Sequence, residues 1–251
     1  MTTADTQAVV TPADSRNGEA GRLCVQRLVP QPFYDRDGIT IYVGDCRIIA
    51  PLLPECDLLL TDPPYGLRDK LQGGTWGKSF EGDYKDWDAS TPPNWTLEML
   101  MAKTRWQILW GGNYYNLPPS RGWLIWNKPE RGLTMADAEL AWTNRDCNIR
   151  TYDGSRNPDG KRVHPTQKPI GLMSWCLNQV PEAKSVLDPY LGSGSSLVAA
   201  KDRGLRGIGI EINPAYAAAA VERLSQGVLG LGNDEMRDGE RKTIATTTDH
   251  I

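Results

Sequence analysis

A proline-rich turn after the apolar run 57–61 brings together groups that could bind an amine. The turn consists of Asp62, Pro63, Pro64 and Tyr65. Proline has no N–H to donate, so the Asp62 carboxylate and the Pro63 carbonyl can both accept hydrogen bonds. Such an acceptor pair matches an amino group, and Tyr65 adds a flat face for a stacked ring. The alternative interpretation is an ordinary proline turn after a strand.

A second turn, after the apolar run 185–188, has features of a nucleoside site. Gly192 and Gly194 allow the backbone to turn sharply and to approach a ligand, while the N-terminus of the following helix attracts an anionic group. Glu211, about twenty residues further on, stands where an acid can hold a ribose diol. We therefore expect a nucleoside ligand. Leu197 replaces the third glycine of a dinucleotide site, and a glycine turn without a ligand is the alternative.

A third segment, residues 164–169, precedes a helical pattern and reads His-Pro-Thr-Gln-Lys-Pro. Thr166 and Lys168 are of types that usually cap a helix or lie in solvent. The chain has two histidines and five cysteines, and none of the cysteines forms a CxxC pair. The sequence therefore predicts no metal site and no secreted disulfide framework.

The elements that must position these turns alternate between short apolar runs and helical patterns. Strands are expected at 38–43, 57–61, 106–110, 122–126, 138–142, 185–188 and 206–212. Helices are expected at 91–103, 168–180, 195–203 and from Asn213 and Pro214 to 224. This alternation is typical of an α/β fold, a mainly parallel twisted sheet with helices on both faces. The carboxyl ends of parallel strands share one edge, so the two turns should meet there.

Length and composition fit one domain over residues 23–228, with flexible tails at 1–22 and 229–251. The chain has 251 residues, 39% hydrophobic and 24% charged, and a net charge of -3. No global positive field would attract it to nucleic acid or anionic lipid, so a polyanion needs a local basic patch. The first thirty residues do not resemble a signal peptide and no run of eighteen apolar residues occurs, which predicts a cytoplasmic protein without a membrane partner.

The three segments together resemble the motifs of the S-adenosylmethionine-dependent DNA amino-methyltransferases, which methylate exocyclic amines of adenine or cytosine. Asp62-Pro-Pro-Tyr-Gly66 resembles the catalytic motif. Residues 188–196 resemble the cofactor motif, with Tyr190 where phenylalanine is usual, and 164–169 resemble the segment before it. The order resembles that of the permuted β group. The resemblance covers roughly 39–224 and implies a Rossmann-like class I methyltransferase fold.

The resemblance implies S-adenosylmethionine as cofactor and a role for each matching residue. Glu211 would hold the ribose hydroxyls and Asp45 would contact the adenine of the cofactor. Its methionine end would be bound by Thr166, Lys168, Asp188, Tyr190, Gly192, Gly194 and Ser195. Asp62 and the carbonyl of Pro63 would accept the two amine protons, and these hydrogen bonds would strengthen as positive charge develops on nitrogen.

The expected partner is double-stranded DNA, whose target base must be flipped out and could stack on Tyr65. The glycine-rich segment 67–90 is expected to be a mobile loop that orders on DNA. Residues 144–163 form a short recognition segment, in which 145–162 hold five basic residues against three acidic ones. The DNA-contacting residues expected are Arg68, Lys70, Lys78, Arg150, Arg156, Lys161 and Arg162. The alternative for both segments is a solvated surface.

The specific function implied is methylation of the 6-amino group of adenine in DNA, in a bacterial or phage-infected cell. By resemblance, the Asp-Pro-Pro-Tyr sequence favours adenine, although the same acceptor pair would serve the 4-amino group of cytosine. Methylation of RNA or of a protein amide is a further alternative, and so is a non-catalytic DNA-binding or regulatory subunit with the same fold. The sequence leaves open the recognition site, whether the chain forms a homodimer, and whether a restriction enzyme accompanies it.

Overall fold

The computed structural model of the chain describes residues 29–67, 88–131, 136–156, 158 and 167–226. The expected tails at 1–22 and 229–251 lie outside these residues, as does most of the expected loop 67–90. Those expectations therefore stay predictions. None of the helices in the described part of the chain is both long and apolar enough to span a bilayer.

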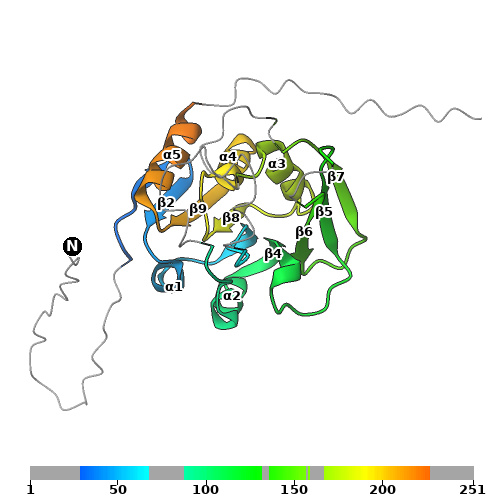
Figure 1. Cartoon of the computed structure of the whole chain (residues 1–251). Helices are drawn as coiled ribbons and strands as arrows, with labels where there is room; N and C mark the ends of the chain where they lie inside the picture. Colours follow the sequence, from blue (N-terminus) through cyan, green and yellow to red (C-terminus); the bar gives the residue numbers. More distant parts are fainter. Residues whose placement is uncertain (1–28, 68–87, 132–135, 157, 159–166, 227–251) are drawn as a thin grey trace, which may run out of the picture.

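The described residues build one nine-stranded sheet in the order β1-β2-β9-β8-β3-β4-β6-β5-β7 (Figure 1). The strands are β1 (Tyr34–Arg36), β2 (Ile39–Val43), β3 (Cys56–Thr61), β4 (Thr104–Trp110), β5 (Trp123–Asn127), β6 (Ala138–Thr143), β7 (Arg150–Asp153), β8 (Ser185–Asp188) and β9 (Arg206–Glu211). The run from β2 to β4 is parallel throughout, and β5 pairs with β7 in parallel. Strands β1 and β6 are antiparallel to their neighbours. The predicted mainly parallel sheet is confirmed.

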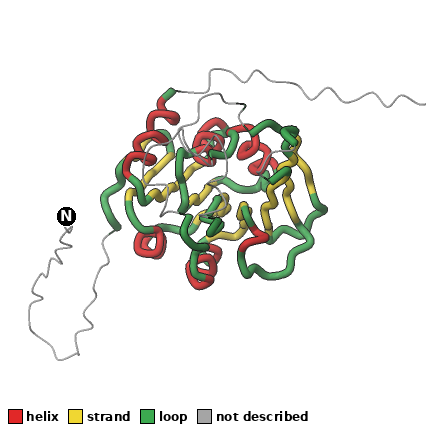
Figure 2. Tube along the Cα trace, viewed as in Figure 1, coloured by secondary structure: helices red, strands yellow, loops and turns green. Residues whose placement is uncertain are grey.

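Helices cover both faces of this sheet (Figure 2). One face carries α1 (Cys46–Ile49) and α2 (Asn94–Met101), with the 3-10 turns Ala50–Leu52 and Gly112–Tyr114 nearby in the chain. The other face carries α3 (Ile170–Asn178), α4 (Ser195–Asp202) and α5 (Pro214–Ser225). Asn213 caps α5 by accepting from the Ala215 N–H at 2.9 Å, with Pro214 in the first turn as expected.

Alternation along the central strands supplies both hydrophobic layers. Leu58 and Leu60 of β3 belong to the cluster that packs under α3 and α4, while Leu59 between them points into the cluster under α1 and α2. All three are fully buried. Successive side chains of a strand point to opposite faces, so a continuous apolar run is what a central strand covered on both sides requires.

The arrangement of β3 and β8 determines where the two turns lie. These strands are parallel neighbours, with Leu58 opposite Val186 and Leu59 opposite Leu187. The turns that follow them therefore leave the sheet at the same edge. The hydroxyl of Thr61, the last residue of β3, donates to Asp188 at 2.7 Å and ties the two strand ends together. The chain continues to β4 on one side and to β9 on the other, and ligands of open α/β sheets bind where the strand order reverses in this way.

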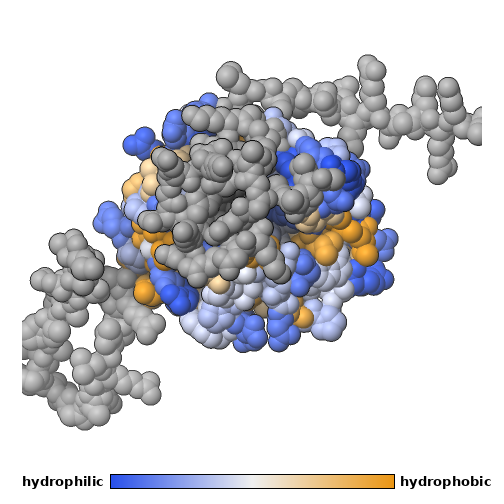
Figure 3. Space-filling model, viewed as in Figure 1, coloured by the Kyte–Doolittle hydropathy of each residue, from blue (hydrophilic) through white to orange (hydrophobic). Residues whose placement is uncertain are grey.

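Three features differ from the sequence expectations. The short elements β1 and α1 were not expected. Residues 150–153, expected within a recognition segment, form strand β7, which pairs with β5 at the edge of the sheet. An edge strand with exposed residues lacks the apolar run that reveals a buried strand, which explains why the sequence did not indicate it. Figure 3 shows hydrophilic and hydrophobic residues side by side on the part of the visible face that is not drawn in grey.

Candidate active site

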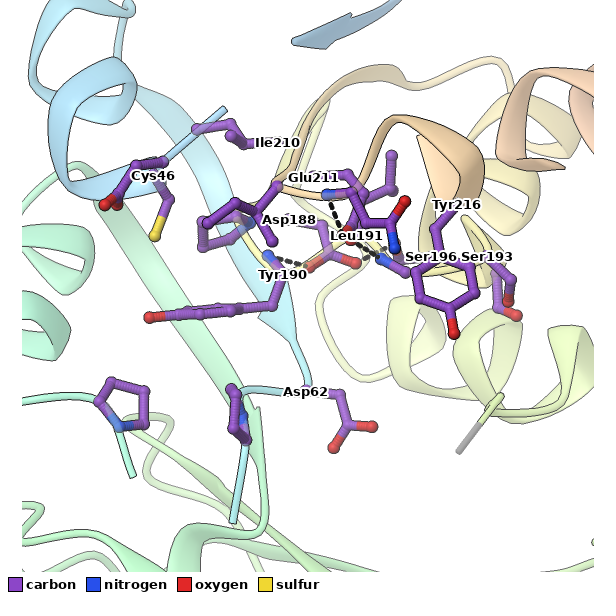
Figure 4. A pocket seen from close by; sticks show the side chains of 18 of the residues that line it. Cys46, Asp62, Asp188, Tyr190, Leu191, Ser193, Ser196, Ile210, Glu211 and Tyr216 are labelled. Atoms are coloured by element: carbon purple, nitrogen blue, oxygen red, sulfur yellow. Dashed lines mark hydrogen bonds between the residues drawn. The ribbon is translucent and has the colours of Figure 1, made fainter. Parts of the chain in front are cut away.

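A cavity of about 600 Å³ lies between the two turns. Figure 4 shows Asp62 on one side of it, with Glu211 and Tyr216 across from it and Tyr190 between. The lining residues come from the ends of β2, β3, β8 and β9 and from the segment before α3, and they include Asp45, Asp62, Pro64, Lys168, Asp188, Tyr190, Gly192, Ser195 and Glu211. The structure thus brings most of the described residues predicted for cofactor and amine binding into one cavity.

The backbone of the turn after β8 depends on its glycines. Gly192 and Gly194 have φ angles of 52° and 80°, a left-handed conformation that residues with a Cβ rarely adopt. A Cβ built on Gly194 would lie 2.8 Å from the Cβ of Ala220 in α5. Gly194 therefore permits close packing of α4 against α5, while Gly192 lines the cavity.

Asp188 holds this turn together from within. It is 4% exposed and accepts from the hydroxyls of Thr61 and Ser196 and from the Tyr190 N–H at 3.2 Å. Burial raises the pKa of Asp188 to about 6, although these hydrogen bonds favour the ionised form. Its carboxylate acts first as a brace between β8, α4 and β3. The Ser195 hydroxyl extends this scaffold by donating to the Lys168 carbonyl at 2.7 Å.

Two acidic side chains remain at the far end of the cavity. Glu211 accepts from the backbone N–H groups of Gly192 at 2.7 Å and Asn213 at 2.9 Å, one on each oxygen. Each oxygen has a second lone pair, so the fixed carboxylate can still accept from a diol. Burial raises the pKa of Glu211. Asp45 caps α1 and forms an ion pair with Arg47 at 2.5 Å, in addition to lining the cavity.

The turn after β3 is fixed by charged and phenolic groups. The Tyr65 hydroxyl donates to one oxygen of Asp62, and the Lys168 ammonium contacts the other at 2.5 Å. The carbonyl of Pro63 accepts from the Tyr115 hydroxyl at 2.7 Å. Asp62 and the carbonyl each retain further lone pairs, so the expected acceptor pair is present but already held in position.

The ammonium of Lys168 does not point toward the turn after β8, where the resemblance placed it to bind the methionine end of the cofactor. Lys168 lines the cavity, but its ammonium is directed to Asp62 rather than to the turn after β8. It also contacts Glu139 at 3.1 Å, and its side chain is only 5% exposed, so it is neither a helix cap nor a solvated charge. Burial would lower the pKa of Lys168, but the carboxylates of Asp62 and Glu139 outweigh burial and raise it.

Glu139 and Lys128 are functional candidates that sequence reasoning missed. Glu139 binds Lys168 through one oxygen and Lys128 through the other, and the Lys128 side chain is 2% exposed. Burial acts against the charge on Glu139, but both lysines together lower its pKa to about 2. Burial raises the pKa of Asp62, and the charge of Glu139 adds to that rise. The signal that could have found this pair was a charged residue inside the apolar strand β6 and another directly after the tryptophan-containing strand β5.

The ring of Tyr65 is less open than a stacking platform would be. It stacks on Tyr114 with a centroid distance of 4.8 Å and an interplanar angle of 16°. The Lys168 ammonium lies 5.4 Å from the centroid of the same ring. A flipped base could therefore meet Tyr65 only at a surface that these two side chains leave open.

The residues predicted to contact DNA differ in their exposure to solvent, and several lie outside the described residues. Arg150 is exposed on β7, as a phosphate contact requires. Arg156 contradicts the prediction, because it is 8% exposed, donates to the Ala136 carbonyl at 2.8 Å and lies 3.7 Å from Glu130. Its charge is turned inward by those partners. Five further residues predicted to contact DNA lie outside the described residues, and so does Thr166, which was predicted to bind the cofactor: Arg68, Lys70, Lys78, Lys161 and Arg162.

Comparison with known proteins shows which family this chain resembles. Residues 123–222 match the model of the N6/N4 DNA methylases. The type II methyltransferase M2.LlaDCHI of Lactococcus lactis subsp. cremoris is 26% identical over 80% of this chain and 94% of its own length. The type II methyltransferase M2.DpnII of Streptococcus pneumoniae is 26% identical over 78% of this chain and 93% of its own.

A solved structure supports the fold assignment. The PvuII DNA methyltransferase, described as cytosine-N4-specific, superimposes with a TM-score of 0.52 at 15% identity, covering 78% of this chain and 87% of that one. The likeness shows that the sheet and its helices have the class I methyltransferase arrangement. Together with the family match over residues 123–222 and the similar type II methyltransferases, this likeness supports an S-adenosylmethionine-dependent DNA amino-methyltransferase.

Proposed function

We propose that this protein transfers a methyl group from S-adenosylmethionine to the 6-amino group of adenine in double-stranded DNA. The observation that carries the proposal is the pairing of β3 with β8, which puts the acceptors of the amine-binding turn and the glycine turn around one cavity. The adenine assignment rests on the Asp62-Pro63-Pro64-Tyr65 sequence. The setting proposed is the cytoplasm of a bacterial or phage-infected cell.

The residues around the cavity fit this cofactor. A volume of about 600 Å³ is in the range of small-molecule and cofactor sites. Glu211, fixed by two backbone N–H groups, is suited to the ribose hydroxyls, and Asp45 to the adenine end. The turn from Asp188 to Ser195 would hold the methionine end, with Thr166 as a further proposed contact. The bound cofactor supplies a methyl group on a sulfonium, which is a strong electrophile.

The chain would activate the amine by hydrogen bonding. The exocyclic nitrogen is a poor nucleophile because its lone pair is delocalised into the ring. Acceptance of its two protons by Asp62 and the Pro63 carbonyl favours a pyramidal nitrogen, and both bonds strengthen as positive charge develops. Asp62 is held in place by Tyr65 and Lys168 before the substrate arrives, so little reorganisation is needed.

The base must leave the duplex to reach this cavity, at a cost of a few kcal/mol. Among the described residues predicted to contact DNA, Arg150 remains the proposed backbone contact. The residues Arg68, Lys70, Lys78, Lys161 and Arg162 stay predictions, and so do the mobile loop 67–90 and the homodimer.

The experiment is mass spectrometry of nucleosides from duplex DNA that has been incubated with the full chain and S-adenosylmethionine carrying a labelled methyl group. We expect labelled 6-methyladenine. Labelled 4-methylcytosine without 6-methyladenine would contradict the base assignment and leave the family intact. RNA and protein acceptors in parallel reactions test the other substrate classes, and labelling of either in preference to DNA would overturn the proposed substrate.

A further inference from the structure

Four charged side chains form a chain that extends from the amine-binding turn into the protein. Lys168 lies between two carboxylates, 2.5 Å from Asp62 and 3.1 Å from Glu139. The other oxygen of Glu139 binds Lys128. Two negative and two positive charges therefore alternate, and the outermost carboxylate is the one that faces the cavity. Glu139 has no place in the amine-binding turn or in the cofactor end of the site.

Resting on the proposed function, we propose that Glu139 is a positioning residue for methyl transfer, which shares the Lys168 ammonium with Asp62 and so preserves the acceptor strength of Asp62. The ammonium holds Asp62 in place at one oxygen. Because Glu139 binds the same ammonium, only part of the positive charge of Lys168 is available to neutralise Asp62. Asp62 then remains a strong acceptor for the amine protons.

The arrangement of the strands explains how Glu139 reaches this place. Strand β6 is antiparallel to β4 and β5, so its first residues lie at the edge of the sheet where its neighbours end. Glu139, the second residue of β6, pairs with Trp126 near the end of β5, and Lys128 follows that strand. Lys168 arrives from the segment before α3. Three separate segments thus supply the charges behind Asp62.

The groups facing Glu139 define what its removal would change. They are Lys168, Lys128, the Tyr65 hydroxyl at 3.5 Å and the carboxylate of Asp62, and the charge of Arg156 acts in turn on Lys128. Without the charge of Glu139, the Lys168 ammonium would pair with Asp62 alone. The pKa of Asp62 would fall, because the charge of Glu139 is one of the causes that raise it. Asp62 would become a weaker acceptor.

A purely structural role is the competing explanation. In this explanation, the single role of Glu139 is to be the counter-ion of Lys128, which is almost fully buried. Removing one partner of a buried pair is strongly destabilising, whereas removing both partners often is not. The double variant Glu139→Gln with Lys128→Met therefore separates the two roles. It eliminates the buried pair but still leaves Lys168 bound to Asp62 alone.

The test measures the single-turnover rate of methyl transfer as a function of pH, at saturating cofactor and DNA. We expect Glu139→Gln and the double variant to be slower by roughly 10- to 100-fold, with cofactor affinity within about threefold of the unmodified protein. The acid limb of the rate should move to lower pH in both variants. Glu139→Asp, which keeps the charge, should recover part of the rate. If Glu139→Gln alone does not fold, the double variant carries the same comparison.

The control is Glu182→Gln, which removes a carboxylate from an exposed ion pair with Arg145 and should leave rate and pH profile unchanged. A double variant as fast as the unmodified protein would overturn the inference and leave Glu139 as a counter-ion. A slower double variant with an unmoved acid limb would overturn it as well. Absence of methyl transfer by the unmodified protein would instead refute the proposed function, so the two failures are distinguishable.

Discussion

The two turns at the edge of the sheet are held in different ways. The turn after β8 is organised by hydrogen bonds from hydroxyls and backbone N–H groups to Asp188 and Glu211, which come from residues near in the chain or in neighbouring strands. Arg223 of α5 adds a hydrogen bond to the Ser193 carbonyl at 2.7 Å. The turn after β3 depends on charges from distant segments, above all Lys168, which lies 106 residues away from Asp62. Binding a large ligand requires a fixed backbone, whereas activating an amine requires a tuned charge.

The same contrast explains why one turn could be predicted more completely than the other. Glycine, proline and capping residues act locally, so the spacing of Gly192, Gly194 and Glu211 already indicates a turn, a helix start and an acid beside them. The network around Asp62 depends on which strands are neighbours. Predictions about these turns should therefore separate binding from chemistry.

The largest expected effect is on chemistry at the turn after β3. Asp62→Ala should lower the single-turnover methylation rate by roughly 10²- to 10³-fold or more, because it removes an acceptor that strengthens in the transition state. Cofactor affinity should change by less than about threefold, which is under 1 kcal/mol. Asp62→Asn, which keeps the shape, is the matched variant and should also be slow. Turnover equal to that of the unmodified protein in Asp62→Ala would remove Asp62 from the mechanism.

The next effect is on the backbone of the turn after β8. Gly194→Ala places a Cβ at φ 80° and 2.8 Å from Ala220. The conformation should cost about 1–2 kcal/mol and the crowding a further 1–3 kcal/mol of unfolding free energy. Gly204→Ala is the control, since Gly204 has φ 68° with nothing within 4 Å of a built Cβ. Thermal or denaturant unfolding should show the larger loss for Gly194→Ala; equal losses would contradict the packing role.

Asp188 in the turn after β8 and Glu139 behind the turn after β3 should respond to acid in opposite directions. The pKa of Asp188 is raised to about 6 in the folded protein, so the folded state binds a proton that the unfolded state lacks between about pH 4 and 6. Asp188 therefore lowers stability as pH rises through this range. The pKa of Glu139 is lowered to about 2, so its stabilising contribution is lost as pH falls from about 4.5 toward 2.

Denaturant unfolding at several pH values tests this difference. Asp188→Asn should reduce the loss of stability between pH 4 and 6 by roughly 1–3 kcal/mol. Glu139→Gln should leave that interval nearly as steep and flatten the one below pH 4.5. If Asp188→Asn changed only the interval below pH 4.5 and Glu139→Gln only the interval between pH 4 and 6, the opposite roles of these two carboxylates would be contradicted.

The smallest effect concerns the surface outside both turns. Arg150→Ala should reduce the slope of log affinity against log salt for duplex DNA by about one, because one phosphate contact is lost. Arg156→Ala should leave the slope unchanged and lower stability, since Arg156 is buried against Glu130 and Ala136. An unchanged slope in Arg150→Ala would remove β7 from the DNA-binding surface.

Most of the sheet could be predicted because its strands are apolar runs between glycine, proline and polar residues. The site residues that sequence reasoning missed or misplaced have a common cause, which is pairing between segments that are distant in the chain. Glu139 lies in a strand that was expected and Lys128 directly follows β5, but β6 pairs between β4 and β5, and no local pattern specifies that order. Arg156 was expected on the surface from the local excess of basic residues, yet Glu130 and the Ala136 carbonyl hold it inside. Charge counts along a chain do not tell which charges have buried partners.

The two turns are proposed to form one site that binds the methyl donor. The most direct test of this site is a calorimetric titration of S-adenosylmethionine into the full chain, with Glu211→Ala in parallel. We expect saturable heat with one equivalent bound by the unmodified protein, and an affinity weakened by about 10-fold or more in Glu211→Ala, from the loss of hydrogen bonds to a charged acceptor. No heat at any concentration, together with no shift of the unfolding temperature, would contradict it.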